Sequence, residues 1–291
     1  MPNLSSPATV TDALAQAQML GLERLDAQML VLHAVGRPVA DRAWLLTHDT
    51  DRVPAQAAEA LQAALQRRLD GEPVAYITGH KEFFGLDLHV DARVLVPRPD
   101  TETLVQWALD VLDGAVQASV LDLGTGSGAI ALAIKSSRPD VAVHARDFST
   151  DALEVAQANA RRLGLDVQFS QSSWFADLPD RYTVVVSNPP YIAELDSHLP
   201  ALRHEPLQAL TSGPDGLNDI RQIIAQAGNH LQPGGWLLLE HGHDQSNAVC
   251  ALLTAAGLEH AQSRTDLTGT LRCSGARQPS VSTHELNREV L

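Results

Sequence analysis

The chain has 291 residues and a formal net charge of −14, because 35 Asp and Glu outnumber 21 Lys and Arg. Its 44% hydrophobic and 19% charged residues are typical of a globular protein with one large or two ordinary domains, which excludes a disordered chain. Basic residues occur at most in pairs, so the sequence lacks the clustered basic surface that usually holds nucleic acid. We therefore expect no direct nucleic-acid partner.

The sequence also argues against membrane and metal partners. Its apolar runs are far shorter than a membrane span, and its first residues have neither a basic region nor an apolar signal core. Cys250 and Cys273 do not have metal-ligand spacing and do not form a disulfide framework. We expect a cytoplasmic monomer without a metal site.

The first part of the chain predicts a small helical domain, residues 1–72. Apolar residues recur at helical spacing over 13–20, 22–35 and 40–47, and Pro54 opens a fourth helix that ends before Gly71. Such a bundle either stabilises the remainder of the chain or docks a substrate too large for a pocket. We assign it the docking role.

Residues 73–97 predict a β-hairpin linker, with extended segments at 76–79, 82–86 and 88–90 around a glycine turn. Arg98 follows between two prolines, which hold it stiffly where it can face a ligand. Asp100 or Thr101 is predicted to cap the next helix. The alternative interpretation of this segment is a plain linker that ends in a helix cap.

Residues 98–277 alternate between strand and helix patterns, which predicts a mostly parallel Rossmann-like α/β sheet. The last two strand segments, 258–264 and 269–272, are too close for a crossover helix, so one sheet edge should carry an antiparallel pair. Residues 278–291 are polar and are expected to form a mobile tail. The remaining predicted strands cover 119–123, 141–145, 167–169, 183–187 and 236–240, and the helices cover 129–135, 150–163, 217–231 and 245–256.

A glycine loop, Gly-Thr-Gly-Ser-Gly at 124–128, joins the first of these strands to a helix. Such a loop lets the backbone approach a ligand closely, with helix N–H groups available beyond it. Asp147, at the end of the second strand, is placed to bind a ribose diol. This combination predicts a nucleotide-type ligand, but alone it does not distinguish NAD from S-adenosylmethionine.

The apolar strand 183–187 ends in Asn188-Pro189-Pro190-Tyr191. Two prolines cannot continue a central strand, so the chain leaves the sheet at Asn188, on the edge where α/β sheets bind ligands. The Asn188 side-chain oxygen and the Pro189 carbonyl can each accept one hydrogen from a planar amide nitrogen, and Tyr191 offers a flat face. The alternative is a Pro-Pro terminator with a solvent-facing asparagine.

Together, the dense glycine loop, the Asn-Pro-Pro-Tyr tip and the final antiparallel strand resemble the class I S-adenosylmethionine-dependent methyltransferases. Five segments allow a finer comparison: Pro-Arg-Pro-Asp-Thr-Glu at 97–102, Asp-Leu-Gly-Thr-Gly-Ser-Gly at 122–128, Asn-Pro-Pro-Tyr at 188–191, Glu-Pro-Leu at 205–207 and Leu-Leu-Glu-His-Gly at 238–242. Through them the chain resembles, within that class, the peptide chain release factor glutamine methyltransferases, from its helical start to about residue 277.

The resemblance implies methylation of the N5 amide of the glutamine in the Gly-Gly-Gln motif of release factors, with S-adenosylmethionine as methyl donor and S-adenosylhomocysteine as product. Asn188, Pro189 and Tyr191 would be catalytic, and Arg98 and Pro190 would join them in binding the substrate. The residues that would bind the cofactor are Gly124, Thr125, Gly126, Ser127, Gly128, Asp147, Trp174 (near the adenine) and Asn188.

Other interpretations stay open at this point: an adenine-N6 nucleic acid methyltransferase, a ribosomal-protein glutamine methyltransferase, or a module that binds S-adenosylmethionine without catalysis. The histidines His204, His241 and His243 lack metal-ligand spacing and are interpreted as structural or surface residues. The sequence does not indicate a role for Glu205.

Overall fold

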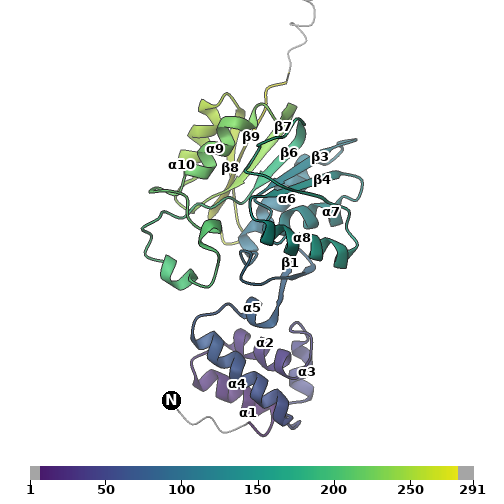
Figure 1. Cartoon of the computed structure of the whole chain (residues 1–291), viewed down its shortest axis with the longest axis vertical. Helices are drawn as coiled ribbons and strands as arrows, with labels where there is room; N and C mark the ends of the chain where they lie inside the picture. Colours follow the sequence, from purple (N-terminus) through teal and green to yellow (C-terminus); the bar gives the residue numbers. More distant parts are fainter. Residues whose placement is uncertain (1–6, 281–291) are drawn as a thin grey trace, which may run out of the picture. The chain divides into compact units, whose positions relative to one another are not determined.

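The structure, a computed structural model, describes residues 7–280 and contains two compact units that divide after His80. The first unit is helical, and each of its helices ends near a glycine, a proline or a short turn. Its helices are α1 (Val10–Met19), α2 (Arg24–Ala34), α3 (Arg42–Thr47), α4 (Ala55–Leu69) and α5 (Val74–Thr78), labelled in Figure 1.

The four predicted N-terminal helices are confirmed. Thr9 caps α1 in a capping box, since its hydroxyl accepts the Asp12 N–H while the Asp12 carboxylate accepts the Thr9 N–H at 3.0 Å. The helices meet around a buried apolar cluster that includes Leu30, Leu61 and Leu65. Each such leucine contributes roughly 1.5–3 kcal/mol of hydrophobic stabilisation when fully buried.

The predicted extended segment at 76–79 is wrong, because Val74–Thr78 forms the helix α5. Pro73 precedes the helix with a φ of −57°, and the Thr78 hydroxyl donates to the Val74 carbonyl at 3.0 Å. Gly79 ends the helix in the left-handed region. The hairpin itself is confirmed further on, where β1 (His80–Phe83) pairs with β2 (Leu86–His89).

The second unit is built on a seven-stranded sheet with the order β5-β4-β3-β6-β7-β9-β8. Pairing is parallel from β5 to β7, whereas β9 is antiparallel to both of its neighbours. The predicted reversed strand is therefore β9, and β8 forms the edge beyond it. The strands are β3 (Ser119–Leu123), β4 (Ala142–Asp147), β5 (Gln168–Gln171), β6 (Tyr182–Ser187), β7 (Leu231–Glu240), β8 (Glu259–Thr265) and β9 (Leu271–Arg277).

Helices cover both faces of this sheet, which gives the Rossmann-like three-layer arrangement that the sequence predicts. Figure 1 shows α9 and α10 on one side and α6, α7 and α8 on the other. Within residues 7–280, every helix is too short or too polar to cross a bilayer. The helical segments are η1 (Pro99–Thr101), α6 (Glu102–Val111), α7 (Ala129–Ser137), α8 (Thr150–Leu163), η2 (Leu199–Leu202), η3 (Leu207–Ala209), α9 (Asn218–Ala227) and α10 (Ser246–Ala255).

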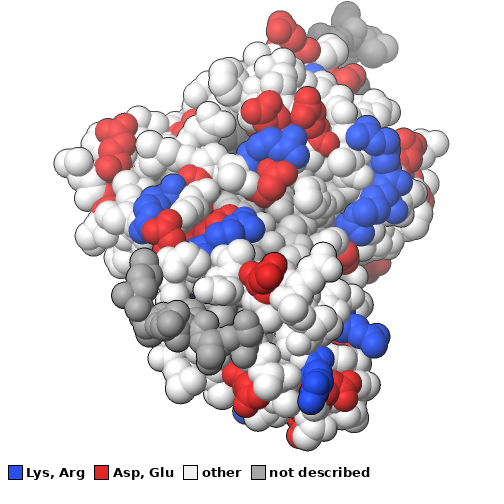
Figure 2. Space-filling view, turned by 60° about the horizontal axis from the view of Figure 1, so that its bottom comes forward, with Lys and Arg blue, Asp and Glu red and all other residues white. Residues whose placement is uncertain are grey.

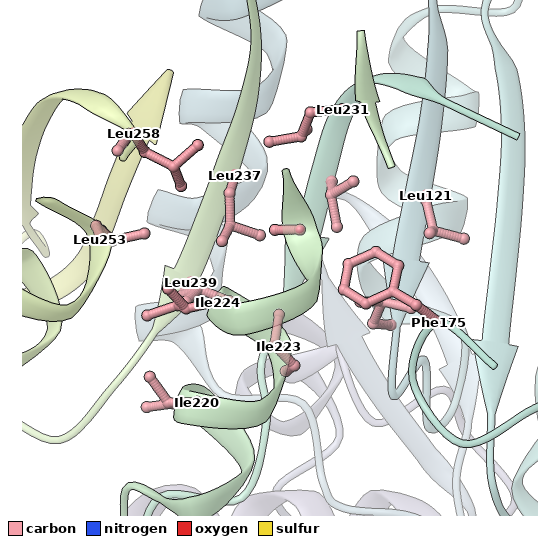
Figure 3. Packing of buried hydrophobic residues seen from close by; sticks show 14 of the residues in the cluster. Leu121, Phe175, Ile220, Ile223, Ile224, Leu231, Leu237, Leu239, Leu253 and Leu258 are labelled. Atoms are coloured by element: carbon pink, nitrogen blue, oxygen red, sulfur yellow. The ribbon is translucent and has the colours of Figure 1, made fainter. Parts of the chain in front are cut away.

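One apolar cluster of this unit lies between the sheet and α9 with α10. Figure 3 shows Leu237 and Leu239 of β7 facing Ile220 and Ile223 of α9, and all four side chains are fully buried. Because side chains alternate along a strand, the intervening Leu238 points to the opposite face, where α6 lies. Both faces of the central strands are thus buried, and the strand ends are left to carry the polar chemistry.

Two predicted boundaries around β7 are wrong. The helix predicted over 217–231 ends at Ala227, and β7 begins at Leu231 instead of 236. The early part of β7 includes Gly235, where a Cβ would lie 2.9 Å from the Tyr182 carbonyl oxygen, so glycine is needed for the strand to run this close to β6. Gln278 then pairs with the backbone of Gly234 and Gly235. Of the tail predicted to be mobile, residues 281–291 lie outside the described residues.

Candidate active site

The carboxyl ends of neighbouring parallel strands open on a cavity of about 330 Å³. Leu123, the last residue of β3, pairs in register with Arg146 of β4 and Ser187 of β6, so three chain exits meet at one edge. The cavity brings together most of the predicted cofactor residues. Those that line it are Gly124, Thr125, Gly126, Ser127, Asp147, Trp174 and Asn188.

The glycine loop needs its glycines for two different reasons. Gly124 has a φ of +71°, and a Cβ there would lie 3.4 Å from the Trp174 ring, so the ring covers this part of the loop. Gly128 has a φ of +84°, and its Cβ would lie 3.0 Å from Leu132 and 3.2 Å from Ala156. Gly128 is outside the cavity lining and serves the contact between α7 and α8.

Asp147 fastens the same loop to the end of β4. One carboxylate oxygen accepts the Gly126 N–H at 2.9 Å, and the other accepts the Ser149 N–H at 2.9 Å. Burial raises the pKa of this carboxyl, and the two N–H donors oppose that shift. Each carboxylate oxygen keeps a further lone pair, so Asp147 can still accept hydrogen bonds from a pair of hydroxyl groups.

Asp122 lies fully buried beneath the loop. Its Oδ2 atom accepts the Thr125 hydroxyl at 2.7 Å and the Ala131 N–H at 3.2 Å, which ties the loop to the start of α7. Its Oδ1 atom is buried and has no hydrogen-bond partner among residues 7–280. Burial raises the pKa of Asp122 to about 7, so part of its population is protonated at neutral pH.

Two residues of the Asn-Pro-Pro-Tyr tip line the cavity, and the other two do not. Asn188 and Pro190 line the cavity, whereas Pro189 is buried and, like Tyr191, is not among the lining residues. The Tyr191 ring packs against the apolar cluster beside α9, and its hydroxyl donates to Glu240 Oε1 at 3.2 Å. Tyr191 thus supports the tip from behind.

Asn188 is held by a residue from a distant part of the chain. Its Nδ2 atom donates to the Thr101 hydroxyl oxygen at 3.2 Å. The predicted helix cap is therefore wrong, because neither Arg98 nor Thr101 makes a side-chain cap and Asp100 pairs with Arg272 at 3.1 Å. The Thr101 hydroxyl instead serves the strand tip.

Glu240 completes this arrangement at the end of β7, where its side chain is buried. Burial raises its pKa to about 7, and the neighbouring hydroxyls of Thr101 and Tyr191 oppose the shift. Its Oε2 atom is buried and has no hydrogen-bond partner within the part of the chain that the structure describes. The sequence signal for Glu240 is an acid at the end of an apolar strand, but that pattern does not indicate which side chains it meets.

Arg98 contacts Glu205 and does not line the cavity. Its guanidinium pairs with one oxygen of the buried Glu205 carboxylate, while the other oxygen accepts the Val96 N–H at 3.1 Å. The residues that follow, Pro206 and Gln208, line the cavity. Glu205 therefore fastens the segment that borders the cavity to the extended stretch before η1, a role that the sequence did not indicate.

The chain matches known families over nearly its whole length. Residues 101–250 match the family described as "Methyltransferase small domain", and residues 8–79 match the "PrmC N-terminal domain". A Burkholderia pseudomallei release factor glutamine methyltransferase is 49% identical, with 94% of this chain and 98% of that protein covered. A relative of the same name from Bordetella pertussis is 49% identical over 88% of this chain and 95% of its own.

The chain belongs to the release factor glutamine methyltransferase family. This membership confirms the resemblance seen in the sequence, and the members of the family are methyltransferase enzymes. The solved structure of a methyltransferase from Pyrococcus furiosus superposes on this chain with a TM-score of 0.51 and 19% sequence identity. The match covers 76% of this chain and 100% of the Pyrococcus chain. That likeness shows the shared fold alone.

The histidines of this family member are placed as follows. His241 is buried with its Nε2 atom 2.7 Å from the Ser274 hydroxyl, and burial lowers its pKa, so it is a neutral structural group. His243 is exposed and His204 is half-buried. Among residues 7–280, no group of His, Cys, Asp and Glu side chains is placed to hold a metal ion.

Proposed function

We propose that this protein transfers a methyl group from S-adenosylmethionine to the side-chain amide nitrogen (N5) of the glutamine in the Gly-Gly-Gln motif of peptide chain release factors, and so acts in translation termination. One observation carries the proposal: the strand-tip amide of Asn188 opens on the same cavity as the loop at Gly126 and the carboxylate of Asp147. The whole-chain similarity to enzymes of that name supports it.

The cofactor half of the cavity fits S-adenosylmethionine. Gly124 to Ser127 offer close backbone approach, Asp147 accepts the ribose hydroxyls, and the Trp174 ring beside Gly124 offers an apolar face for the adenine. Bound S-adenosylmethionine supplies an electrophilic methyl group on a positively charged sulfur. Gly128 contributes indirectly, since it sets the position of α7 behind the loop.

The substrate half has to overcome the weak nucleophilicity of an amide nitrogen, whose lone pair is delocalised into the carbonyl. The rotation barrier of roughly 18–20 kcal/mol measures that delocalisation. Asn188 Oδ1 and the Pro189 carbonyl accept the two N–H bonds of the glutamine, which fixes the direction of its nitrogen lone pair. Pro190 keeps the second acceptor rigid, and Tyr191 supports the strand tip from behind.

The rate then comes mainly from holding the nitrogen in one orientation, a proximity effect. The nitrogen gains the methyl group and loses one N–H proton, which leaves late to solvent without a dedicated base. Arg98 contributes by holding Glu205 and hence the cavity-lining segment at Pro206.

The domain roles form part of the same proposal. Residues 1–72 dock the release factor, residues 73–97 link the two domains, and residues 98–277 carry out the methyl transfer. The protein works as a monomer in the cytoplasm, where its free thiols Cys250 and Cys273 stay reduced. On the face drawn in Figure 2, basic side chains lie among acidic ones in small groups. That distribution suits a protein substrate better than a phosphate backbone, and so disfavours the adenine-N6 alternative.

Labelled methyl transfer tests the proposal. Purified release factor, its Gly-Gly-Gln→Gly-Gly-Ala variant, a glutamine-methylated ribosomal protein and duplex DNA are offered in parallel with labelled S-adenosylmethionine. We expect label on the intact release factor only. Label on the DNA or on the ribosomal protein instead would contradict the assignment.

A further inference from the structure

The side chain of Gln245 joins three separate pieces of backbone beside the strand tip. Gln245 is the half-buried residue just before α10. Its Nε2 atom donates to the Tyr191 carbonyl oxygen at 3.0 Å and to the Asp215 carbonyl oxygen at 3.2 Å. Its Oε1 atom accepts the Gly242 N–H at 2.8 Å. One amide therefore contacts the end of the Asn-Pro-Pro-Tyr tip, the loop before α9 and the turn after β7.

Only one orientation of the Gln245 amide satisfies these contacts. A primary amide has two N–H donors at one end and a carbonyl acceptor at the other. Two backbone carbonyls face the donor end and one N–H faces the acceptor end, so turning the amide over would break all three hydrogen bonds. The backbone N–H of Gln245 also donates to the Gly242 carbonyl at 3.0 Å, which holds the residue in place. Both donors of the side chain are thus in use.

Gly216 also packs closely against the Tyr191 carbonyl. A Cβ on Gly216 would lie 2.1 Å from the Tyr191 oxygen and 2.8 Å from Gln245 Nε2, so only glycine leaves room for this contact. The next residue after the tip, Ile192, forms a parallel bridge with Thr211. The outgoing and returning parts of the connection between β6 and α9 are therefore fastened together next to Gln245.

We propose that Gln245 is a positioning residue that fixes the Tyr191 carbonyl and thereby the direction of the Pro189 carbonyl, the second acceptor for the substrate amide. The tip is held at Asn188 through its side chain and at Tyr191 through Gln245. Pro189 and Pro190 lie between these two anchors, and their fixed φ angles leave the backbone few ways to turn. This inference rests on the proposed function, because it is the substrate amide that needs the acceptor at Pro189.

Two variants of similar length remove the donors of Gln245. Gln245→Met has none, and Gln245→Glu turns lone pairs toward the two backbone carbonyls. We expect kcat for release factor to fall about 10-fold in Gln245→Met and about 30- to 100-fold in Gln245→Glu. Absence of methylation by the wild type would contradict the proposed function, and the carbonyl signal described below tests the positioning in either case.

Cofactor binding distinguishes positioning of the tip from a general loss of structure. The contacts of Gln245 lie outside the glycine loop and Asp147, so the affinity for S-adenosylhomocysteine, measured by calorimetry, should stay within about twofold of wild type. Gln262→Met and Gln262→Glu, at an exposed position on β8, are the matched controls and should leave kcat unchanged. Thermal unfolding of each variant identifies any that fails to fold.

A readout independent of turnover is the ¹³C carbonyl signal of Tyr191 in protein labelled at its tyrosine carbonyls. The chain has 3 tyrosines, and the Tyr191 signal is identified by its loss in Tyr191→Phe. It should move in both Gln245 variants but not in the Gln262 controls, while the signals of Tyr76 and Tyr182 stay in place. An unmoved Tyr191 signal, a Gln245→Glu kcat within about twofold of wild type, or a parallel loss of kcat and cofactor affinity would each overturn the inference.

Discussion

The side-chain nitrogen of Asn188 lies 3.2 Å from the hydroxyl oxygen of Thr101, a residue 87 positions earlier in the chain. The strand tip is therefore oriented by the segment before α6, and its amide oxygen is left for a ligand. This relationship links the Pro-Arg-Pro-Asp-Thr-Glu and Asn-Pro-Pro-Tyr segments, which are far apart in sequence, in a single site.

Replacing Asn188 should separate catalysis from folding. Asn188→Ala removes an acceptor for the substrate amide, so we expect roughly 100-fold lower kcat. The polar atoms that it removes are only half-buried, so the fold should lose little. The thermal midpoint should stay close to that of the wild type. Asn229→Ala, an exposed position after α9, is the control. Near-normal turnover of Asn188→Ala would sink the assignment of this residue.

Removing Glu205 should loosen the segment that borders the cavity. Glu205→Ala breaks the ion pair with Arg98 and leaves the Val96 N–H without its acceptor, so the free energy of unfolding should fall by about 2–4 kcal/mol in urea titrations. KM for the release factor should rise with it. Glu194→Ala, exposed in the same connection, should change neither value, and equal effects of the two variants would contradict the role of Glu205.

Alanine substitutions at two glycines of the cofactor loop should have different effects. Gly128→Ala meets Leu132 and Ala156 with a φ of +84°, so it should lower the free energy of unfolding by about 1–3 kcal/mol. Gly126 has a φ of +55°, so alanine there also strains the backbone, but its Cβ meets no atom within 4 Å. Gly126→Ala should therefore weaken S-adenosylhomocysteine binding, measured by calorimetry, more than it lowers stability. The opposite ranking would place the cofactor elsewhere.

Asp122 should make stability depend on pH. Its folded pKa of about 7 lies above the ordinary 3.8, so the folded state binds the proton more tightly than the unfolded state does. The contribution of Asp122 to the free energy of unfolding is complete below about pH 4. It falls by at most about 4 kcal/mol as the pH rises to about 7, and then it levels off. Glu240, with a pKa also raised to about 7, adds a slope of the same sign.

The measurement is the free energy of unfolding from pH 5 to pH 8 for wild type and Asp122→Asn. The variant should show a shallower decline, with the remainder due to Glu240. An unchanged slope would mean that Asp122 is already charged in the folded protein throughout this range.

Local sequence patterns correctly predicted strands and helices in the part of the chain where strand and helix alternate regularly. The strand Ser119–Leu123 and the helix Thr150–Leu163 were predicted with the boundaries that the structure shows, because the first is a short apolar run ended by glycine and the second has a Ser149 cap and an amphipathic face. The helix Val74–Thr78 was missed, since its β-branched and aromatic residues favour a strand and only Pro73 and Gly79 indicate a turn of helix.

The site shows a similar division. Glycine spacing and the two prolines point to the strand ends, so the residues around Gly126 and Asn188 could be found from local sequence. The partners of Thr101, Glu205 and Glu240 depend on contacts across many residues. Nothing in the Pro-Arg-Pro-Asp-Thr-Glu segment indicates that Arg98 turns to a buried glutamate, because that choice is made by tertiary packing.

Locating the methyl group by tandem mass spectrometry tests the central claim most directly. Release factor is incubated with S-adenosylmethionine and either wild-type protein or Asn188→Ala, then digested and sequenced. We expect one added methyl group on the side-chain amide of the Gly-Gly-Gln glutamine with wild type, and almost none with the variant. A methyl group on any other residue, or equal methylation by Asn188→Ala, would contradict the proposed function.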